Sequence, residues 1–495
     1  MTTTSVRDTW DSQQRDRTAR HIRYWLAVVG LAMADGLSFT LASLIFRHGQ
    51  SVPSLLITSG AASIPHAPID VFLILAIAFV VVRYLAGDYG RRQLFWDGAK
   101  LTTIALLITA LPDVAMLLLA RGNFSVMHAL ASWLFLLFAV PMMRQGARVL
   151  MTRLDIWQIP TVMIGAGARA AEIHDALKHS LSLGFDVRWL VLANPNAGLP
   201  PEMTSLRAVH SDDSTRTAHL MRNAGCKQAI VAAEDVQSSH FADVAQRLLE
   251  VNIPVAVIPA LTRLPLAGLT TSYFFGRDIL MLQVRSNVQR LPWRIVKRGF
   301  DLIGSLALLI LLSPLFLILA IAIKRSGPGP ITYSHTRVGR HGVLFDCIKL
   351  RTMVSNADDV LWRWSQENPE LYEEFLRTYK LKDDPRITPV GVWLRRTSLD
   401  ELPQLWNVLR GHMSLVGPRP VIARELEEYY GPAAQLYMRT RPGMTGLWQV
   451  SGRSDTSYER RIILDEWYIL NWSFWYDIVI LVQTAWIVLT GKGAF

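Results

Sequence analysis

The stretch Leu302–Ile323, LIGSLALLILLSPLFLILAIAI, decides how this chain is arranged relative to a membrane. Its length matches the roughly 20 residues that a helix needs to cross a bilayer. Ser313-Pro314 interrupts the stretch near its middle, where proline removes a backbone donor and clashes with the preceding turn. Basic residues flank both ends, as expected when both face the cytoplasm. The pattern predicts a re-entrant helix–break–helix over residues 294–325, with a true membrane span as the alternative.

Four further apolar runs in the first third of the chain predict an N-terminal bundle of four transmembrane helices over residues 1–150. The runs are Tyr24–Phe46, Ile69–Leu85, Leu101–Ala120 and Val126–Met143. Lysine and arginine cluster before the first run, between the second and third, and after the fourth, so both ends of the bundle are expected in the cytoplasm. Asp35 and Asp113 lie inside these runs and indicate either a polar path or hydrogen bonds between helices.

The composition of the chain indicates which kinds of molecule it could bind. The 495 residues allow two or three domains, and 51% of them are hydrophobic, so part of the chain lies in lipid. The formal net charge of +11 suits anionic lipid headgroups or phosphorylated substrates. The basic residues form no stripe, so we expect no nucleic acid as a partner. Cys226 and Cys347 are far apart in sequence and cannot by themselves build a disulfide framework or a zinc site.

Residues 158–262 have the rhythm of a Rossmann-like parallel α/β domain. Strands are expected at Thr161–Ile164, Asp186–Leu192, Gln228–Ala232 and Ile253–Ile258. The turn at 165–170, GAGARA, could cradle a diphosphate, but Ala170 replaces the third glycine. Ala193-Asn194-Pro195 stands where an acid normally binds the ribose. We interpret the domain as degenerate, with a regulatory or scaffolding role; an NAD-dependent nucleotide-sugar oxidoreductase or dehydratase is the alternative.

Residues 263–293 are expected to form a linker, and residues 326–495 a mainly α-helical domain. The tail of that domain contains the apolar run Ile478–Thr490, which is too short to span a membrane. Tryptophan and tyrosine side chains in or near the run suit the headgroup zone. We therefore expect an interfacial C-terminal helix, with ordinary packing on the soluble domain as the alternative.

The segment Arg395–Leu402, RRTSLDEL, contains two adjacent carboxylates, Asp400 and Glu401. Neighbours on a helix point about 100° apart, so the two can serve different partners. One can attack phosphorus as a nucleophile while the other holds Mg²⁺. Such chemistry also needs positive charge, for which the sequence offers Lys349, Arg351, Arg395, Arg396 and Arg419. An isolated acid pair is also common on exposed helices.

Two longer motifs around the acid pair favour a catalytic role over an ordinary exposed position. Ser398–Leu409, SLDELPQLWNVL, and Met413–Pro420, MSLVGPRP, resemble the bacterial sugar transferase family, the monotopic polyprenyl-phosphate phosphoglycosyl transferases. Further matching segments are Lys297-Arg298 through Ser313-Pro314, Lys349–Met353 and Pro442–Arg453. The resemblance runs from about Arg294 to the C-terminus, and the preceding regions are similar to the long form of the family.

The resemblance implies transfer of hexose-1-phosphate from a UDP-sugar to undecaprenyl phosphate, at the cytoplasmic face of the bacterial inner membrane. Galactose is the sugar favoured by overall similarity, with glucose next. The product would begin a repeat unit of O-antigen, capsule or exopolysaccharide. The long form is also consistent with a homodimer. A non-enzymatic scaffold for polysaccharide assembly, with an inert acid pair, is the alternative from another class.

The resemblance also implies residue roles. Asp400 is expected to attack the β-phosphorus and release UMP, while Glu401 helps to coordinate Mg²⁺ and Arg395 stabilises the acid pair and the substrate charge. Ser313 and Pro314 are expected to shape the re-entrant helix beside the lipid acceptor. The remaining residues expected to bind or support the substrates are Lys297, Arg298, Lys349, Arg351, Pro418, Arg419, Pro420, Asp465 and Asp477.

Overall fold

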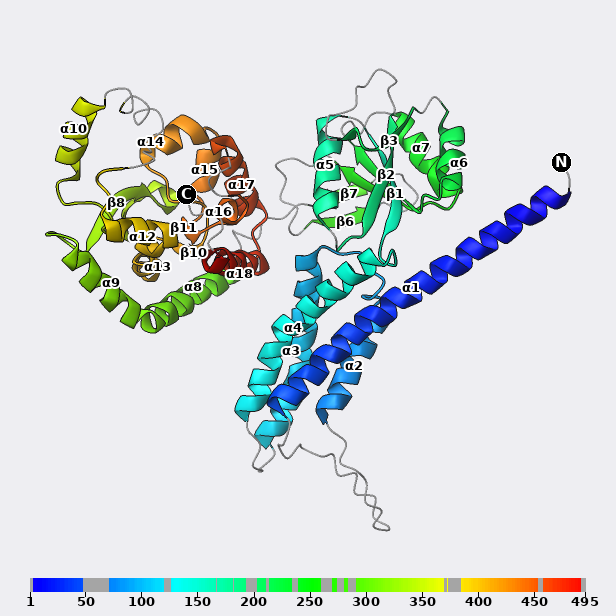
Figure 1. Cartoon of the computed structure of the whole chain (residues 1–495), viewed down its shortest axis with the longest axis horizontal. Coiled ribbons are helices and arrows are strands. Elements are labelled where there is room, and N and C mark those ends of the chain that lie inside the picture. The colour runs from blue at the N-terminus through cyan, green and yellow to red at the C-terminus, as the bar shows by residue number, and fades with distance from the viewer. Residues whose placement is uncertain are drawn as a thin grey trace, which may run out of the picture. The chain divides into compact units, whose positions relative to one another are not determined.

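The structure is a computed structural model in which the chain divides into two compact units, Met1–Ala260 and Leu261–Phe495 (Figure 1). It describes residues 3–47, 71–119, 126–165, 167–180, 182–192, 203–210, 213–233, 239–259, 269–273, 280–283, 291–368, 372, 384–452 and 457–490. Each unit has its own hydrophobic core, so each is described by itself.

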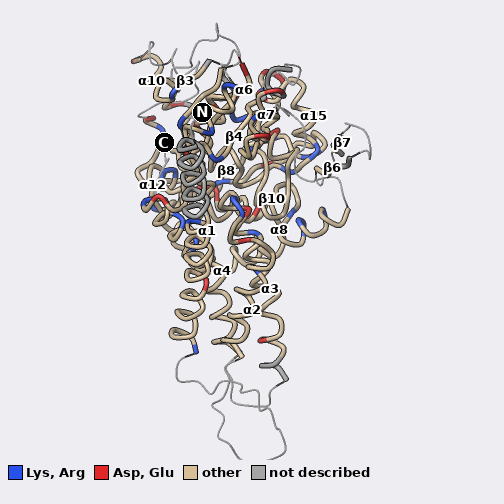
Figure 2. Tube along the Cα trace, turned by 90° about the vertical axis from the view of Figure 1, so that its right-hand side faces the viewer, with Lys and Arg blue, Asp and Glu red and all other residues tan. Residues whose placement is uncertain are grey.

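The first unit begins with four helices that share one apolar core. They are α1 (Thr3–Phe46), α2 (Val71–Leu85), α3 (Phe95–Leu119) and α4 (Val126–Arg153). Their buried side chains include Phe39, Phe79, Leu106 and Trp133, one from each helix. Among the described residues, α1, α3 and α4 contain segments long and apolar enough to cross a membrane, whereas α2 is shorter. Charged residues are sparse along this bundle (Figure 2), and four crossings remain a prediction.

The two aspartates inside the apolar runs link helices to one another. Asp113 on α3 accepts hydrogen bonds from Arg47 Nη2 at 2.5 Å and from Trp133 Nε1 at 2.7 Å. Asp35 on α1 accepts from the Tyr89 hydroxyl at 2.7 Å and lies 2.9 Å from Arg144 Nε on α4. Because buried charges in an apolar bundle are stable only when paired, these contacts favour the hydrogen-bonding interpretation over a polar path.

The rest of the first unit contains a five-stranded parallel sheet of order β3-β2-β1-β4-β5. The strands are β1 (Ile159–Ile164), β2 (Phe185–Leu192), β3 (Arg207–His210), β4 (Gln228–Ala233) and β5 (Val255–Pro259). Four strands were expected, and the additional one, β3, is a four-residue edge strand bounded by Arg207 and His210. Its shortness and polar ends hide it from a search for apolar runs.

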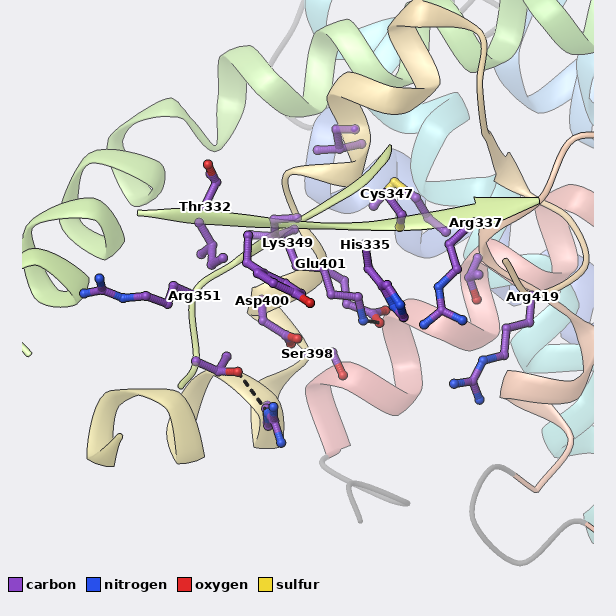
Figure 3. Close-up of a pocket in the computed structure, with 18 of the residues that line it drawn as sticks. Thr332, His335, Arg337, Cys347, Lys349, Arg351, Ser398, Asp400, Glu401 and Arg419 are labelled. Atoms are coloured by element: carbon purple, nitrogen blue, oxygen red, sulfur yellow. Dashed lines mark hydrogen bonds and ion pairs between the residues drawn. The ribbon is translucent and has the colours of Figure 1, made fainter. Parts of the chain in front are cut away.

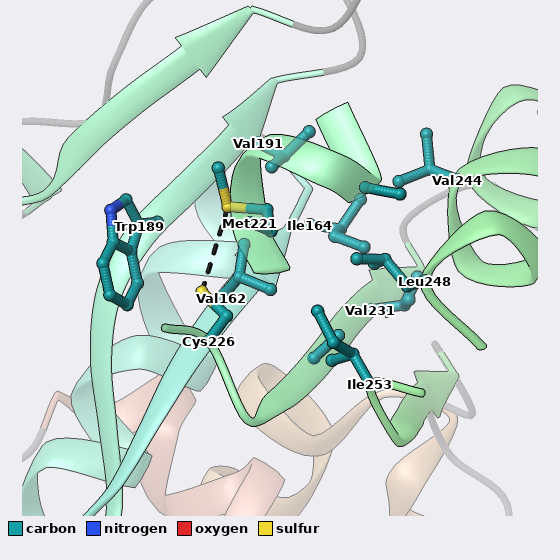
Figure 4. Packing of buried hydrophobic residues seen from close by; sticks show 12 residues of the cluster. Val162, Ile164, Trp189, Val191, Met221, Cys226, Val231, Val244, Leu248 and Ile253 are labelled. Carbon is teal, nitrogen blue, oxygen red and sulfur yellow. Dashed lines mark hydrogen bonds between the residues drawn. The ribbon is translucent and has the colours of Figure 1, made fainter. Parts of the chain in front are cut away.

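Side chains alternate between the two faces of this sheet, as the twofold period of a strand requires. Val162 and Ile164 of β1 pack with side chains of α6 (Ser214–Asn223) and α7 (Ser239–Glu250) (Figure 4). Met163, between them, packs on the opposite face with α5 (Ala168–His179). Helices therefore cover both faces, which explains why β1 and the ends of β2 and β4 next to it are largely apolar.

The glycine turn follows β1 at the point where the strand order reverses. Gly165 has a φ of +143°, and a Cβ there would lie 2.9 Å from the carbonyl oxygen of Ala232 on β4. This close approach gives the glycine a packing role that needs no nucleotide. Ala166 and the segment Ala193-Asn194-Pro195, on which the nucleotide question depends, lie outside the described residues.

The second unit begins in the region expected to be a linker. Residues 263–293 contain an antiparallel pair, β6 (Thr270–Tyr273) and β7 (Leu280–Gln283), and also the start of α8 (Leu291–Leu311). The region expected to be a linker thus contains regular structure, and its role as a linker stays a prediction. Helix α8 begins ahead of the apolar run because Pro292 is well suited to a first helical turn, where its missing N–H is not needed.

The apolar run is broken where the sequence predicts. Helix α8 ends at Leu311, α9 spans Ser313–Arg325, and the two are bent by 61°. Pro314 occupies the first turn of α9, and the Ser313 hydroxyl donates to the carbonyl of Ile310 at 2.8 Å. A bend of this size fits both a re-entrant loop and a broken span, so this alternative stays open.

The remainder of the second unit is built from short elements around a small core. A hairpin of β8 (Thr332–Val338) and β9 (Leu344–Leu350) faces a short parallel pair, β10 (Ser414–Val416) and β11 (Gly443–Thr445), across helix α13 (Gln404–Arg410). The other elements are η2 (Arg340–Gly342), α10 (Ala357–Glu367), α12 (Pro389–Thr397), η3 (Leu399–Glu401), α14 (Ala423–Glu425), η4 (Leu426–Tyr430), α15 (Ala433–Tyr437), α16 (Leu447–Val450), α17 (Tyr458–Leu470) and α18 (Phe474–Thr490).

Helix α18 has the two-sided character expected of the C-terminal helix. Asp477, Val479 and Ile480 are buried, whereas Trp486 and Leu489 are exposed. The first half of the helix therefore packs on the second unit and the last turns are more exposed, so the interfacial position of this helix stays a prediction.

Candidate active site

Two glycines bring the motif loops together. Gly417 precedes Pro418-Arg419-Pro420, and a Cβ on it would lie 2.6 Å from the Arg441 carbonyl oxygen and 2.8 Å from the Gly443 nitrogen. The backbones are joined by Gly443 N–H donating to Pro418 O at 2.8 Å and Gly417 N–H donating to Thr445 O at 2.9 Å. No larger residue fits this crossing, which fixes Arg419 relative to β11.

The two acids lie on a 3₁₀ turn rather than on an α-helix. Ser398 ends α12 with a left-handed backbone (φ 56°), and Asp400 and Glu401 follow in η3. In a 3₁₀ turn with three residues per turn, neighbouring side chains point about 120° apart, so the expected divergence of the two carboxylates holds. Both line a cavity of about 1060 Å³ (Figure 3).

Lys349 on β9 pairs with Glu401. Its Nζ lies 2.6 Å from Glu401 Oε1. Burial disfavours the ammonium ion, but the Glu401 carboxylate outweighs that effect and raises the pKa of Lys349. The strand is held in place by Asn407 of α13, whose side chain accepts from Ile348 N at 3.0 Å and donates to Asp346 O at 2.7 Å. Asn407 thus positions the lysine beside the acids.

The environment of Asp400 changes its pKa. Burial and the neighbouring Glu401 carboxylate raise the pKa of Asp400 to about 6, against the opposing effects of Lys349 and Arg395. Near neutral pH the Asp400 carboxylate is still mostly ionised, and its raised pKa makes it a better base and nucleophile than an exposed aspartate.

Arg395 reaches the same cavity from α12. Its Nε donates to Thr352 Oγ1 at 3.0 Å. Burial lowers its pKa, while the Asp400 carboxylate acts in the opposite direction, as expected for a guanidinium close to that acid. Helix α12 is seated by Thr388, which caps Gly391 N at 3.0 Å.

Positive charge dominates the cavity. Asp400 and Glu401 are its acidic lining residues, against the lysine and arginines Arg337, Lys349, Arg351, Arg386, Arg395, Arg419 and Arg461. The guanidinium carbons of Arg419 and Arg461 lie 5.4 Å and 4.9 Å from the centroid of the Trp448 ring. The sequence motifs did not point to His335, Arg337 or Arg461, which come from β8 and α17. A cavity of this charge is suited to a diphosphate.

Another group of lining residues is apolar. It includes Leu308 of α8, Leu402 and Leu405 near the acid pair, and Leu481 and Val488 of α18. The helix with the break and the C-terminal helix thus both contribute walls to the cavity that holds the acids. A cavity lined by both apolar and charged residues suits a substrate with a phosphate on a hydrocarbon chain.

Several residues expected at the site have structural partners elsewhere. Arg351 lines the edge of the cavity, but its guanidinium donates to the carbonyls of Pro328 (2.6 Å), Gly327 (2.8 Å) and Ile323 (3.1 Å), which terminates α9. Figure 3 shows its side chain directed away from the two acids. It therefore stabilises the end of the membrane-associated helix pair.

Lys297, Arg298 and Asp477 lie outside the lining of this cavity. Lys297 Nζ lies 2.7 Å from Asp477 Oδ2, and the Tyr468 hydroxyl donates to Asp477 Oδ1 at 2.7 Å. Arg298 donates to the carbonyls of Val408 (2.7 Å) and Leu409 (2.9 Å) at the end of α13. These contacts join α8 to α18 and α13.

Asp465 on α17 is buried behind the cavity wall and accepts from the Tyr430 hydroxyl at 2.9 Å. Burial raises its pKa to about 7, although Tyr430 and Arg419 act in the opposite direction. The remaining expected residues, Ser313, Pro314, Pro418 and Pro420, do not line the cavity. Asp301, which the motifs did not single out, accepts from Ser414 Oγ at 3.0 Å and Leu415 N at 3.1 Å and thereby fixes α8 to β10.

The acid pair is suited to Mg²⁺ only together with a substrate. The described residues contain no group of three or more His, Cys, Asp and Glu side chains that could hold a metal alone. Mg²⁺ in phosphoryl-transfer sites is usually bound by one or two carboxylates together with substrate phosphates and water. Two adjacent carboxylates in a cavity that attracts phosphates fit that requirement.

The comparisons with known proteins agree with this geometry. Residues 292–491 match the model of the family described as bacterial sugar transferase. The UDP-galactose-lipid carrier transferase of Erwinia amylovora is 40% identical over 416 residues, 82% of this chain and 84% of that protein. The undecaprenyl-phosphate galactose phosphotransferase of Salmonella typhimurium is 38% identical over 411 residues, again 82% and 84%.

A third relative matches a shorter part of the chain. The exopolysaccharide production protein ExoY of Sinorhizobium fredii is 51% identical over 201 residues, which are 41% of this chain and 88% of that protein. Identity is thus higher over this shorter match, while two relatives extend the similarity over most of the chain. This chain is an enzyme that belongs to the bacterial sugar transferase family.

Proposed function

We propose that this enzyme transfers hexose-1-phosphate, with galactose as the favoured sugar, from a UDP-sugar to undecaprenyl phosphate. The observation that carries the proposal is the composition of one cavity, in which two acids, a majority of cations and apolar residues of α8 and α18 meet. The cations suit the sugar donor and the apolar wall suits the lipid acceptor. The names of the two long relatives support galactose as the sugar and undecaprenyl phosphate as the acceptor.

The first step is attack by Asp400. An oxygen of its carboxylate forms a bond to the β-phosphorus of the UDP-sugar, and the anhydride bond between that phosphorus and the bridging oxygen breaks. The electron pair stays on the bridging oxygen, which leaves as part of UMP. The sugar phosphate remains on Asp400 as an acyl phosphate. Arg395 and Arg419 stabilise the negative charge on the diphosphate.

The second step regenerates the enzyme. A phosphate oxygen of undecaprenyl phosphate attacks the same phosphorus, and the bond to Asp400 breaks with its electron pair returning to the carboxylate. The product is undecaprenyl-diphosphate-hexose. Because both substrates use one nucleophile in turn, UMP leaves before the lipid reacts.

Glu401, with the diphosphate oxygens, would hold Mg²⁺, which neutralises charge on the donor when bound. Lys349 keeps the Glu401 carboxylate in position, with Nζ 2.6 Å from Oε1. The apolar wall excludes water, which would otherwise hydrolyse the acyl phosphate. The lysine therefore acts by positioning, whereas Asp400 acts on the substrate itself.

The membrane arrangement is part of the same proposal. The helix pair α8–α9, with its 61° bend, enters the inner leaflet of the bacterial inner membrane and returns to the cytoplasm. The four N-terminal helices anchor the chain, and α18 lies in the interface. Asp400 then faces the cytoplasm, where the UDP-sugar is dissolved, beside the leaflet that contains the acceptor. The lipid product starts a polysaccharide repeat unit. The active form is proposed to be a homodimer, and mass measurement in nanodiscs tests this.

The test uses the purified full-length chain in lipid nanodiscs with undecaprenyl phosphate, Mg²⁺ and a panel of UDP-sugars. We expect UMP and a lipid diphosphate sugar in equal amounts, fastest with UDP-galactose. Preference for UDP-glucose would change the sugar and keep the reaction. Release of UDP in place of UMP would mean that the sugar moves without its phosphate, and would contradict the proposal. No nucleotide release with any sugar would favour a non-enzymatic scaffold.

A further inference from the structure

A second cavity, of about 470 Å³, lies in the same unit and shares no lining residue with the active-site cavity. Strand β10 separates them. Leu415 lines the active-site cavity, whereas its neighbours Ser414 and Val416 line the second one. Because successive side chains of a strand point to opposite faces, the two cavities lie on opposite sides of β10. A ligand in the second cavity therefore does not sit over Asp400.

The lining of the second cavity is rich in arginine. Arg294 and Arg298 come from α8, Arg340 from η2, and Arg439 and Arg441 from the segment between α15 and β11. Asp301 is the acidic residue among the described lining residues, and its carboxylate accepts from Ser414 Oγ and Leu415 N, both on β10. Within the described part of the chain, none of the five arginines forms an ion pair with a carboxylate.

These arginines lower one another's pKa by electrostatic repulsion. Burial and then Arg294 lower the pKa of Arg340. Burial lowers the pKa of Arg441, followed by Arg298 and Arg340, with only Asp301 acting against them. Like charges gathered in a partly buried cavity repel, and an anion among them removes that repulsion. Arg298 already donates through both Nη atoms to the carbonyls of Val408 and Leu409, so forked donors that match a phosphate come from the other arginines.

The cavity is also bordered by apolar side chains. Leu291, Trp293, Ile295 and Val296, in the first turns of α8, are all exposed. The first two and Ile295 line the cavity together with the arginines. A free phosphate needs only the arginines, whereas the headgroup of a lipid would use the arginines and would place its chains along the exposed apolar residues.

We propose that this second cavity binds a phosphate group and that its occupant is the headgroup of an anionic phospholipid. The site does not take part in the transfer reaction. It fixes the start of α8, and with it the depth at which the helix pair lies in the membrane. Phosphatidylglycerol and inorganic phosphate share the chemistry that the arginines recognise, so the experiment has one arm for each.

The experiment measures the thermal unfolding of the full-length protein in micelles of a neutral detergent, where no charged membrane surface contributes. Phosphatidylglycerol, phosphatidylcholine or inorganic phosphate is titrated in separate arms. We expect phosphatidylglycerol at a hundredfold excess over its Kd to raise the unfolding midpoint by about 5 °C, because a ligand that binds only the folded state stabilises it. We expect phosphatidylcholine to have no such effect.

The variant Arg294→Gln with Arg439→Gln tests the site, because both side chains are exposed and their loss leaves the core intact. It should raise the half-saturating phosphatidylglycerol concentration about 30-fold, from the loss of two arginines near a lipid phosphate. The matched control, Arg325→Gln with Arg460→Gln, removes the same charge from exposed positions outside both cavities and should keep the wild-type midpoint shift.

Each outcome decides the proposal. An equal effect of the two double variants would mean that the attraction depends on net charge, and would overturn the site. A shift with inorganic phosphate as large as with the lipid would assign the cavity to a free phosphate and overturn the lipid assignment. No shift of the wild-type protein in either arm would overturn both. None of these results depends on turnover, so the proposed transfer reaction stands or fails separately.

Discussion

The two cavities on either side of β10 are both lined by arginines, but they differ in their acidic residues. Both collect arginines around a concave surface bordered by apolar residues of α8. One also contains Asp400 and Glu401 on a 3₁₀ turn, whereas the acid among the described lining residues of the other is Asp301, which holds β10. The comparison separates what the two proposals require: phosphate binding needs only the arginines, whereas the transfer reaction also needs a nucleophile held among them.

The largest expected effect concerns the acid that sets the two cavities apart. Asp400→Asn should reduce UMP release by at least about 10⁴-fold, because an amide does not form the acyl phosphate. The measurement is UMP release with UDP-galactose and undecaprenyl phosphate. Asp359→Asn, at an exposed position on α10, is the matched control and should retain wild-type activity. Turnover by the Asp400 variant within tenfold of wild type would remove its assignment as the nucleophile.

A smaller but still large loss is expected when the metal is removed. EDTA should stop UMP release, and added Mg²⁺ should restore it, because Mg²⁺ neutralises the donor diphosphate. Glu401→Gln should lower activity by about 10²- to 10³-fold and raise the Mg²⁺ concentration needed for half-maximal activity. Activity that is insensitive to EDTA would exclude a metal role for Glu401.

The next prediction concerns a contact that supports both cavities. Asp477→Asn leaves Lys297 without its carboxylate partner and should lower the free energy of unfolding by about 3 kcal/mol. Thermal unfolding in detergent measures the loss of stability. The KM for the UDP-sugar in the folded fraction should stay near its wild-type value, because Asp477 lies outside the active-site cavity. A changed KM with an unchanged unfolding midpoint would instead place Asp477 in substrate binding.

The smallest expected effect is on the pH dependence of the reaction. The attacking Asp400 must be ionised, and its pKa is about 6, so kcat/KM for UMP release should fall about tenfold per pH unit below that value. Lys349 lowers this pKa and Glu401 raises it. Lys349→Gln should therefore move the acidic limb to higher pH, and Glu401→Gln should move it to lower pH.

A pH–rate profile of each variant provides the check. Limbs that stay at the wild-type position in both variants would show that another group controls the acidic side of the profile. Movement of both limbs in the same direction would contradict the opposite charges assigned to the two neighbours of Asp400.

Local sequence pointed to the acid pair, Arg395 and Arg419, because they lie in the motifs that resemble the family, and all four line the same cavity. It did not point to His335, Arg337 or Arg461, which reach the cavity from β8 and α17 through the packing of distant segments. The same limit explains why Arg351 was expected to bind substrate, although its guanidinium donates to the carbonyls at the end of α9. Charge and motif position identify a candidate, but its partner is set by tertiary structure.

In the fold, too, features set by a single segment were predicted and features set by distant contacts were missed. Apolar length and the Ser313-Pro314 break predicted helices and a bend that the structure contains, because they are properties of single segments. The short strand β3 and the hairpin β6–β7 were missed, because their stability depends on neighbouring strands rather than on their own apolar pattern.

The most direct test of Asp400 as the covalent nucleophile is the mass of the protein after mixing with Mg²⁺ and UDP-galactose in the absence of undecaprenyl phosphate. The proposed reaction predicts one equivalent of UMP, a protein heavier by one hexose phosphate, and the added mass on the peptide that contains Asp400. Adding undecaprenyl phosphate should restore the original mass. An unmodified protein that releases UMP only when the lipid is present would contradict the covalent step.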